Sequence, residues 1–156
     1  MTDDQFMGEA IRLATDGMRA GRGGPFGCVI VRAGTIVARG DNRVTSTNDP
    51  TAHAEIVAIR QACQVLGTFE LRDCALYASC EPCPMCLASI YWARIPQVFF
   101  AATRQDAAAI GFDDESIYRQ IALPPERRSV VMRPLQRELA LEVLREWERK
   151  PDKTPY

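Results

Sequence analysis

The sequence lacks the features that would place it in a membrane or an export pathway. It has no apolar run long enough to cross a bilayer, and residues 1–4 lack the basic and apolar segments of a signal peptide. We therefore expect a cytoplasmic protein with no membrane partner. Internal repeats and low-complexity segments are also missing, and a length of 156 residues suits one domain, expected to span 1–156.

Lysine is scarce, because only Lys150 and Lys153 are found among the 19 basic residues. The arginines are scattered among 20 acidic residues, the net charge is -1, and the sequence pI is about 5.9. Proteins that bind nucleic acid usually carry a basic patch or stripe. No such stripe stands out, so no nucleic-acid partner is expected.

Histidine is scarcer still, and the single residue, His53, stands two positions before Glu55. Further along, the segment 82–86 places Cys83 and Cys86 three apart between prolines, a spacing at which one helical turn brings both sulfurs to one metal. Structural zinc usually takes four protein ligands, whereas catalytic zinc keeps its fourth position for water or hydroxide. The set predicts one catalytic zinc held by His53, Cys83 and Cys86, with Glu55 as proton acceptor.

The spacing also predicts where these side chains lie. Residues two apart point to nearly opposite sides in the middle of a helix, so His53 and Glu55 can converge only at a first turn. A helix start is expected there, with Asp49 or Thr51 as N-cap, and Pro82 and Pro84 indicate a second start near Cys83. The zinc would then lie between two helix N-termini, whose free amides favour thiolate and hydroxide.

Two other uses of these cysteines fit the pattern less well. Cys80 could complete a closed four-ligand structural site, but the pairing of His53 with Glu55 then has no purpose. A thioredoxin-like redox use of Cys83 and Cys86 ignores His53. The cysteines at 28, 63 and 74 lie in apolar stretches and are expected to be small core residues.

The order of the expected elements predicts an α/β fold. Helices are expected at 3–20, 83–93, 106–110 and 115–121. Another helix is expected to carry a buried stripe from Ala52 to Leu66, and a last amphipathic helix to carry Leu135 to Trp147. Strands are expected at 26–31 and 35–39, joined as a hairpin, and at 75–79 and 97–101. The economical architecture is a layered α/β/α fold with a central mixed sheet and the site at one end of the strands. Asn42, after the second strand, is either a turn former or a ligand contact.

The combined motifs carry a family resemblance that spans nearly the whole chain. The histidine, glutamate and paired cysteines match the signature of zinc-dependent base deaminases. With them, several further segments resemble the guanine deaminases of the cytidine deaminase superfamily: 24–27, 48–55, 80–86, 91–94, 111–114, Ile117-Tyr118 and the closing Tyr156. The zinc motif alone is shared with tRNA adenosine and cytosine deaminases, so the segment 111–114 and Tyr156 favour guanine.

This resemblance implies a function and a set of site residues. The implied reaction is hydrolysis of guanine to xanthine and ammonia, with Glu55 moving protons and Asp114 binding the 2-amino edge and assisting proton delivery. The residues implied to contact the base are Asn42 and the Ala54 backbone by hydrogen bonds, Phe26 and Trp92 as apolar walls, and Tyr156 as the closing group. A homodimer with exchanged C-terminal segments is also implied, with the tail 151–156 closing an active site.

Three alternatives stay open at this point. One is a tRNA adenosine deaminase, which the absence of a basic excess disfavours. A second is a deaminase of cytosine or another amino-substituted ring such as a triazine, which differs only in pocket shape. The third, from another class, is a non-catalytic interaction module stabilised by structural zinc.

Overall fold

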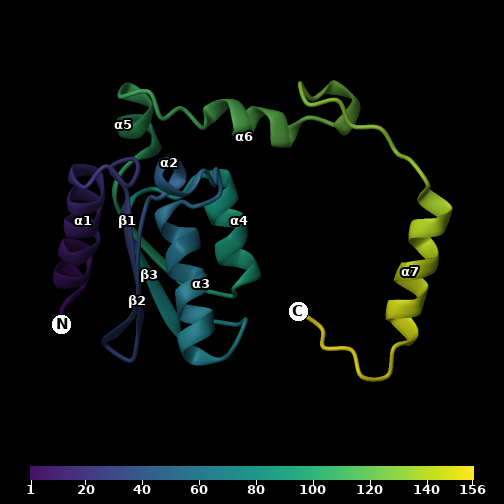
Figure 1. Ribbon diagram of the computed structural model, residues 1–156, viewed down its shortest axis with the longest axis horizontal. Coiled ribbons are helices and arrows are strands. Elements are labelled where there is room, and N and C mark those ends of the chain that lie inside the picture. Colours follow the sequence, from purple (N-terminus) through teal and green to yellow (C-terminus); the bar gives the residue numbers. More distant parts are fainter. The chain divides into compact units, whose positions relative to one another are not determined.

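The computed structural model describes residues 1–156, which group into two compact units, 1–114 and 115–156. The first unit is built on a four-stranded sheet of order β2-β1-β3-β4 (Figure 1). Its strands are β1 (Gly27–Arg32), β2 (Thr35–Asp41), β3 (Cys74–Cys80) and β4 (Gln97–Ala102). Strand β1 runs antiparallel to β2 and β3, and β3 runs parallel to β4. The predicted mixed sheet is confirmed.

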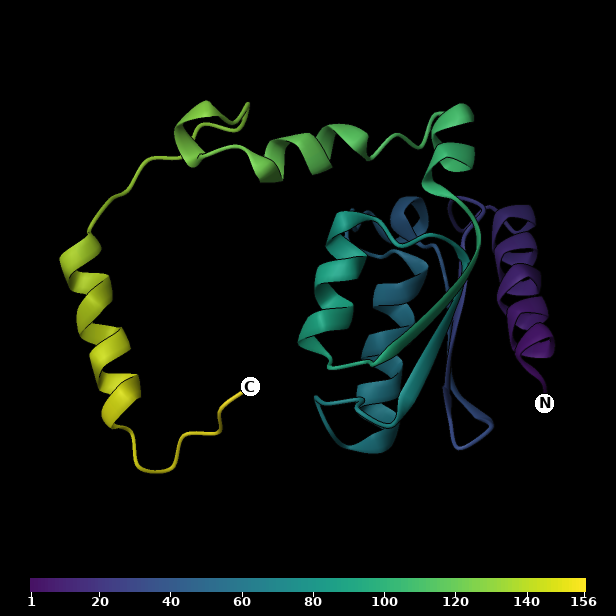
Figure 2. The same cartoon turned by 180° about the vertical axis from the view of Figure 1, so that it is seen from behind.

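Helices cover both faces of this sheet (Figures 1 and 2). Helix α1 (Asp3–Arg19) lies on one face, and α3 (Ala54–Leu66) and α4 (Pro84–Trp92) lie on the other. Side chains of a strand alternate between faces, and β1 follows this rule: Cys28 and Ile30 join the core beneath α3, while Val29 and Val31 pack toward Phe6 of α1. The layered α/β/α architecture is therefore as predicted.

Helix α1 begins with a capping box. The Thr2 hydroxyl accepts a hydrogen bond from the Gln5 amide, and the Gln5 side chain accepts one from the Thr2 amide, so two donors of the first turn are satisfied. Its buried residues recur at helical spacing: Phe6, Ala10, Ala14 and Gly17. The helix ends at Arg19, one residue before the predicted end.

The hairpin of β1 and β2 turns at Ala33 and Gly34, both with positive φ. Pairing continues to the register Gly27↔Asp41, so β2 ends at Asp41, two residues later than predicted. The added residues matter for function because they fix Asp41 within the ladder and place Asn42 directly at the end of the strand.

The predicted start of the second helix was wrong. Helix α3 begins at Ala54 with His53 as its N-cap residue, whereas Asp49 and Thr51 precede it in a turn. The Asp49 carboxylate accepts hydrogen bonds from the Thr51 amide (2.8 Å) and hydroxyl (2.7 Å), so it stabilises this turn and not a helix. A short helix that was not predicted, α2 (Val44–Thr47), lies just upstream.

The buried stripe of α3 also differs from the prediction. Ala52 and Ile56 are buried as expected, but Ile59, Cys63 and Leu66 are only half-buried. Ala58 and Ala62 instead pack fully against the sheet. Small side chains let this helix approach the strands closely, which apolar periodicity alone does not predict.

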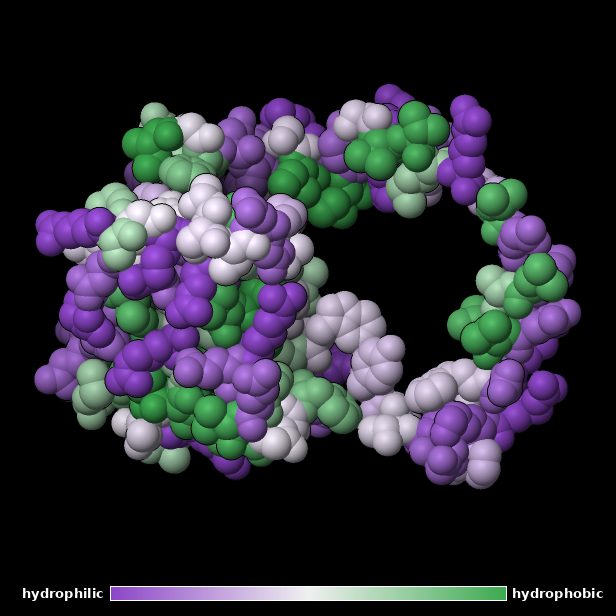
Figure 3. Space-filling model, in the orientation of Figure 1, coloured by the Kyte–Doolittle hydropathy of each residue, from purple (hydrophilic) through white to green (hydrophobic).

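Helix α5 (Arg104–Ala109) closes the first unit, and the second unit holds α6 (Glu115–Ala122), a short 3-10 turn (Pro125–Arg127) and α7 (Arg137–Arg149). None of the residues in these last elements is buried. Hydrophobic side chains lie exposed on α6 and α7 (Figure 3): Ile117, Ile121, Leu139, Val143, Leu144 and Trp147. No helix of the chain is long and apolar enough to span a membrane.

Candidate metal centre and active site

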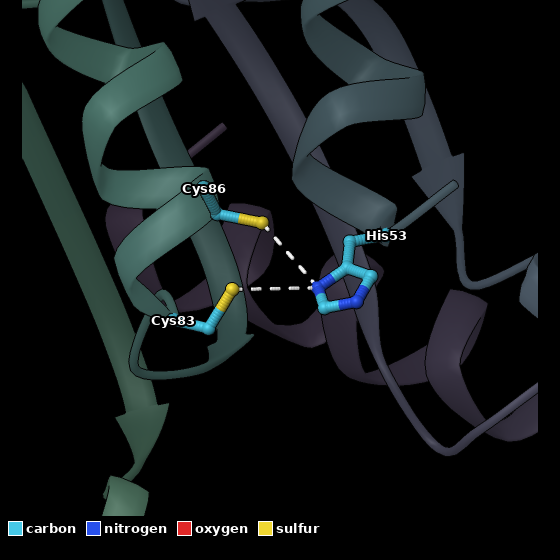
Figure 4. A group of neighbouring side chains, drawn as sticks. All are labelled: His53, Cys83 and Cys86. Carbon is cyan, nitrogen blue, oxygen red and sulfur yellow. Dashed lines mark hydrogen bonds between the residues drawn. The ribbon is translucent and has the colours of Figure 1, made fainter. Parts of the chain in front are cut away.

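Two helix N-termini bring the predicted zinc ligands together. His53 is the N-cap residue of α3, Cys83 is the N-cap residue of α4, and Cys86 lies in the first turn of α4. Pro84 occupies the first turn, where its missing amide hydrogen has no helical partner to lose. Figure 4 shows the His53 ring facing both sulfurs from the neighbouring helix.

The spacing of the three side chains fits a tetrahedral zinc ion. His53 Nδ1 lies 3.5 Å from Cys83 Sγ and 3.5 Å from Cys86 Sγ, and all three atoms lie within 4.8 Å of one another. Zinc bonds of about 2.3 Å to sulfur and about 2.0 Å to nitrogen at tetrahedral angles place nitrogen and sulfur roughly 3.5 Å apart. The donor set and its spacing therefore suit zinc with little rearrangement.

Charge around the cluster also favours a cation. Hydrogen bonds from Cys86 and His53 lower the pKa of the Cys83 thiol to about 4, while donation to Cys83, together with burial, raises the pKa of Cys86. The negative Cys83 raises the pKa of His53 in turn. Cys86 and His53 thus donate hydrogen bonds to the Cys83 thiolate. A bound metal ion would replace the protons of these hydrogen bonds.

Glu55 lies beside this cluster in the first turn of α3 and is only 7% exposed. Burial raises the pKa of its carboxyl group above the ordinary value, while hydrogen bonds from its own backbone amide and from Cys86 lower it. A buried carboxylate with a raised pKa next to a metal site can accept a proton from water and return it to a bound molecule.

Cys80 lies apart from the three ligands. It is not among the side chains close enough to share a metal ion, and its thiol donates to the Thr103 carbonyl oxygen at 3.6 Å. Burial raises its pKa to about 11. This arrangement favours the open three-ligand site over the closed four-ligand one. Cys28 and Cys74 are buried as expected, and Cys63 is half-buried.

Strand β2 approaches the start of α3 closely just before Asn42. At Gly40 an added Cβ would lie 2.1 Å from the Ala54 carbonyl oxygen, so only glycine permits this contact. Asn42 is 6% exposed, and its Oδ1 accepts hydrogen bonds from the Gly24 and Val44 amides, each at 3.2 Å. Ala54 is the first residue of α3, where the backbone amide has no intrahelical acceptor.

Two further predicted residues lie around the same end of the sheet. Phe26 directly precedes β1. Burial and the negative charge of Cys83 raise the pKa of the Asp114 carboxyl group, which places Asp114 near the cluster. The structure adds Phe112, which sequence reasoning did not select: its ring meets Phe26 edge to face, with centroids 4.9 Å apart. The only sequence signal for Phe112 was its place in the segment 111–114.

Trp92 lies away from the cluster in the first unit, and Tyr156 belongs to the second unit. Trp92 ends α4, about 13 Å along the helix axis from Cys83, and it is 62% exposed. Tyr156 ends the second unit and is also exposed. The sequence-based roles of both residues stay predictions.

Comparison with known proteins agrees with this geometry. Residues 1–102 match the family model described as the cytidine and deoxycytidylate deaminase zinc-binding region. A guanine deaminase of Bacillus subtilis is 58% identical over 130 residues, which cover 83% of each chain. A tRNA-specific adenosine deaminase of Aquifex aeolicus is 40% identical over 102 residues, covering 65% of this chain and 67% of that one.

Solved structures extend the likeness past residue 102. The crystal structure of a guanine deaminase from Bacillus subtilis matches with a TM-score of 0.97 and 51% identity, covering 100% of this chain and 99% of that one. A guanine deaminase from Nitrosomonas europaea matches with a TM-score of 0.70 and 28% identity, covering 93% and 84%. On its zinc-site geometry and its likeness over the full length, the chain belongs to the guanine deaminases of the cytidine and deoxycytidylate deaminase zinc-binding family.

Proposed function

We propose that this protein hydrolyses guanine to xanthine and ammonia with the help of zinc. The observation that carries the proposal is the three-ligand cluster of His53, Cys83 and Cys86, set beside the buried carboxylate of Glu55. A closed structural site has no use for such a carboxylate, whereas hydrolysis needs a proton acceptor next to the metal. The likeness to guanine deaminases over the full length supports guanine as the substrate.

In this proposal His53, Cys83 and Cys86 would hold one zinc, which would supply a polarised water for attack on the base. Glu55 would take one proton from that water and give it to the ring nitrogen. It would then take the water's second proton, which is on the newly added hydroxyl, and give it to the amine, which departs as ammonia. Its raised pKa suits a group that both accepts and delivers protons, because such a group works best when its pKa lies nearer the working pH. Asp114, whose pKa is also raised, assists this delivery from the edge that carries the 2-amino group.

Recognition of the base follows from the hydrogen-bonding groups around the cluster. Since Asn42 Oδ1 accepts from two backbone amides, its amide nitrogen is the group left to donate to an acceptor on the purine. The Ala54 amide at the start of α3 anchors the same ligand. Phe26, held edge-on by Phe112, offers an aromatic face on which a flat base can stack.

We also propose that the protein is a homodimer with exchanged C-terminal segments. The apolar side chains of α7 at positions 139, 143 and 147 recur at helical spacing and are exposed, as are Phe99 and Phe100 of β4. Exposed apolar surface of this kind is typical of a site that binds another protein surface. A second copy is the occupant that also gives Trp92 and Tyr156 a place at a site, with residues 151–156 closing it.

In this view residues 1–156 form one deaminase domain whose tail completes a neighbouring site. A cytoplasmic location is part of the proposal, because cysteine ligands keep their thiolates best in a reducing compartment.

The test of the proposed function is ammonia release by the purified, zinc-loaded protein from equal concentrations of guanine, guanosine, adenine, cytosine and tRNA. Release from guanine alone supports the proposal. Release from another substrate alone keeps the zinc chemistry but contradicts the assigned substrate, and tRNA binding that weakens steeply with salt would indicate an RNA substrate. A protein with one zinc per chain and no activity on any of these or on other amino heterocycles such as triazines would favour a structural module.

A further inference from the structure

Three polar or charged side chains of this chain are buried: Asp41, Asn42 and Glu55. The proposed function uses Glu55 for proton transfer and Asn42 for binding the base. Asp41 has no part in it, yet a carboxylate that is 4% exposed is costly unless it is paired. The contacts of Asp41 show what its burial achieves.

Two arginines from different segments pair with the Asp41 carboxylate. Arg22 Nε donates to Oδ2 at 2.5 Å, and Arg43 donates to Oδ1 through Nη2 at 3.1 Å and Nε at 3.3 Å. The carboxylate also rests against α1, where an added Cβ at Gly17 would lie 2.9 Å from Oδ2. We call Arg22, Asp41 and Arg43 the arginine clamp.

The clamp holds the two loops that lie on either side of Asn42. The Arg22 carbonyl accepts hydrogen bonds from the Ser46 amide (3.2 Å) and the Thr45 hydroxyl (3.3 Å), which ties the loop after α1 to α2. The Arg43 amide donates to the Ala52 carbonyl at 2.9 Å, one residue before the ligand His53. Movement of either arginine would therefore shift backbone next to the site.

The Asn42 carboxamide takes its orientation from these same loops. Its backbone amide donates to the Phe26 carbonyl at 3.0 Å, and its Oδ1 accepts from Gly24 in the loop after α1 and from Val44 at the start of α2. Both donors follow an arginine of the clamp closely in the chain. With the oxygen fixed by these two amides, the amide nitrogen can face only the opposite direction.

We infer that Asp41 is a positioning residue for the base-binding step: through Arg22 and Arg43 it fixes the loops that aim the Asn42 amide nitrogen at the substrate. This inference rests on the proposed function, because Asn42 must bind the base for its aim to matter. Asp41 itself does not touch the substrate and acts through Asn42.

The first test replaces the carboxylate by an amide of the same shape. In Asp41→Asn the arginines lose their charged partner but reach solvent, since their side chains are 40% and 46% exposed, so a folded protein is expected. We expect KM for guanine to rise about tenfold or more and kcat to change less than about threefold, with zinc content and melting temperature near wild type. The matched control is Asp73→Asn, which breaks an exposed pair with Arg32 (2.6 Å) and should change neither constant.

The second test asks whether the effect passes through Asn42. Groups that act together are not additive, so in an Asn42→Ala background Asp41→Asn should change kcat/KM less than about threefold. Additive losses, or a lower kcat at unchanged KM, would mean that Asp41 does not act through Asn42 and would overturn the inference. Full activity of the Asn42→Ala protein would also overturn it, because Asn42 would then have no role in binding the base. If Asp41→Asn does not fold, Arg22→Gln replaces it in the cycle, because the carboxylate then keeps Arg43.

The two proposals fail in different ways. A zinc-loaded wild type without activity on any amino heterocycle overturns the proposed function and this inference together. An active wild type with additive losses overturns the inference alone.

Discussion

Residues 1–114 and residues 115–156 differ in how far they bury their apolar side chains. The first unit packs its apolar residues on both faces of the sheet, and the fully buried ones include Ile30, Leu71 and Leu76. The second unit has amphipathic helices but buries none of their residues, and Leu135 is 85% exposed. A helix gains most of its stability from packing its apolar face. The first unit therefore holds the His53, Cys83 and Cys86 cluster in place by its own packing, whereas the proposed dimer would supply the surface that the second unit lacks.

The largest expected effect concerns the chemistry of the first unit. Glu55→Gln keeps the size of the side chain but removes the proton acceptor, so we expect zinc content and fold to persist while turnover of guanine falls about 10²–10⁴-fold. Zinc analysis, circular dichroism and kcat measure the three quantities. The control is Glu70→Gln, which replaces a glutamate paired with Arg72 on the surface. Substantial turnover by the Glu55 variant would mean that another group is the base.

The next effect concerns the end of the second unit. Deleting residues 151–156 should lower kcat about tenfold or more while zinc stays near one per chain, because an open site admits bulk water and weakens electrostatic contacts with the reacting centre. The single substitution Tyr156→Ala should reproduce part of this loss. Full activity in the truncated protein would refute a closing role for the tail.

A smaller effect on activity, but a clear one on assembly, is expected from α7. Val143→Asp places a charge in the exposed apolar stripe and should shift the protein from dimer toward monomer in analytical ultracentrifugation, with lower activity at low protein concentration. Glu146→Gln, on the same helix, is the matched control and should leave the mass unchanged. A wild type that is monomeric at all concentrations would contradict the dimer with exchanged segments.

The smallest effect tests how the first unit holds its own layers together. Hydrogen bonding to Arg12 and Arg39 lowers the pKa of Glu9 to about 2, and the bond between Arg39 Nε and Glu9 Oε1 (2.8 Å) joins β2 to α1. A lowered pKa in the folded state gives stability that is full above about pH 4.5 and is lost as the pH falls toward 2. The melting temperatures of wild type and Glu9→Gln should therefore differ by a few degrees at pH 7 and converge in acid.

Loss of zinc in acid affects both of these proteins, so the difference between them isolates Glu9. A difference in melting temperature that stays constant from pH 7 to pH 2.5 would show that ionisation of Glu9 does not contribute to stability. Asp73→Asn serves as the comparison, because its pair with Arg32 lies at the surface.

Much of the site was predictable because its signals are local. The three zinc ligands and Glu55 stand in two short segments whose spacing fits the first turns of two helices, and the structure brings those ligands within 4.8 Å. The N-cap of α3 was not predictable from the same segment. Asp49 and Thr51 are both good capping residues, and only their mutual hydrogen bonds show that they form a turn before the helix.

Local sequence signals predicted most of the helices and strands and the candidate metal ligands, since capping, helical and strand periodicity, and metal-ligand spacing act over a few neighbouring residues. Tertiary structure alone decided which distant groups meet. The register Gly27↔Asp41 and the sheet order β2-β1-β3-β4 bring Asp41 between Arg22 and Arg43 and set Gly40 against the Ala54 carbonyl oxygen. Packing likewise decided that Phe112 meets Phe26 and that α7 keeps its apolar stripe exposed. Such contacts depend on how whole elements stack, and no local pattern encodes that stacking.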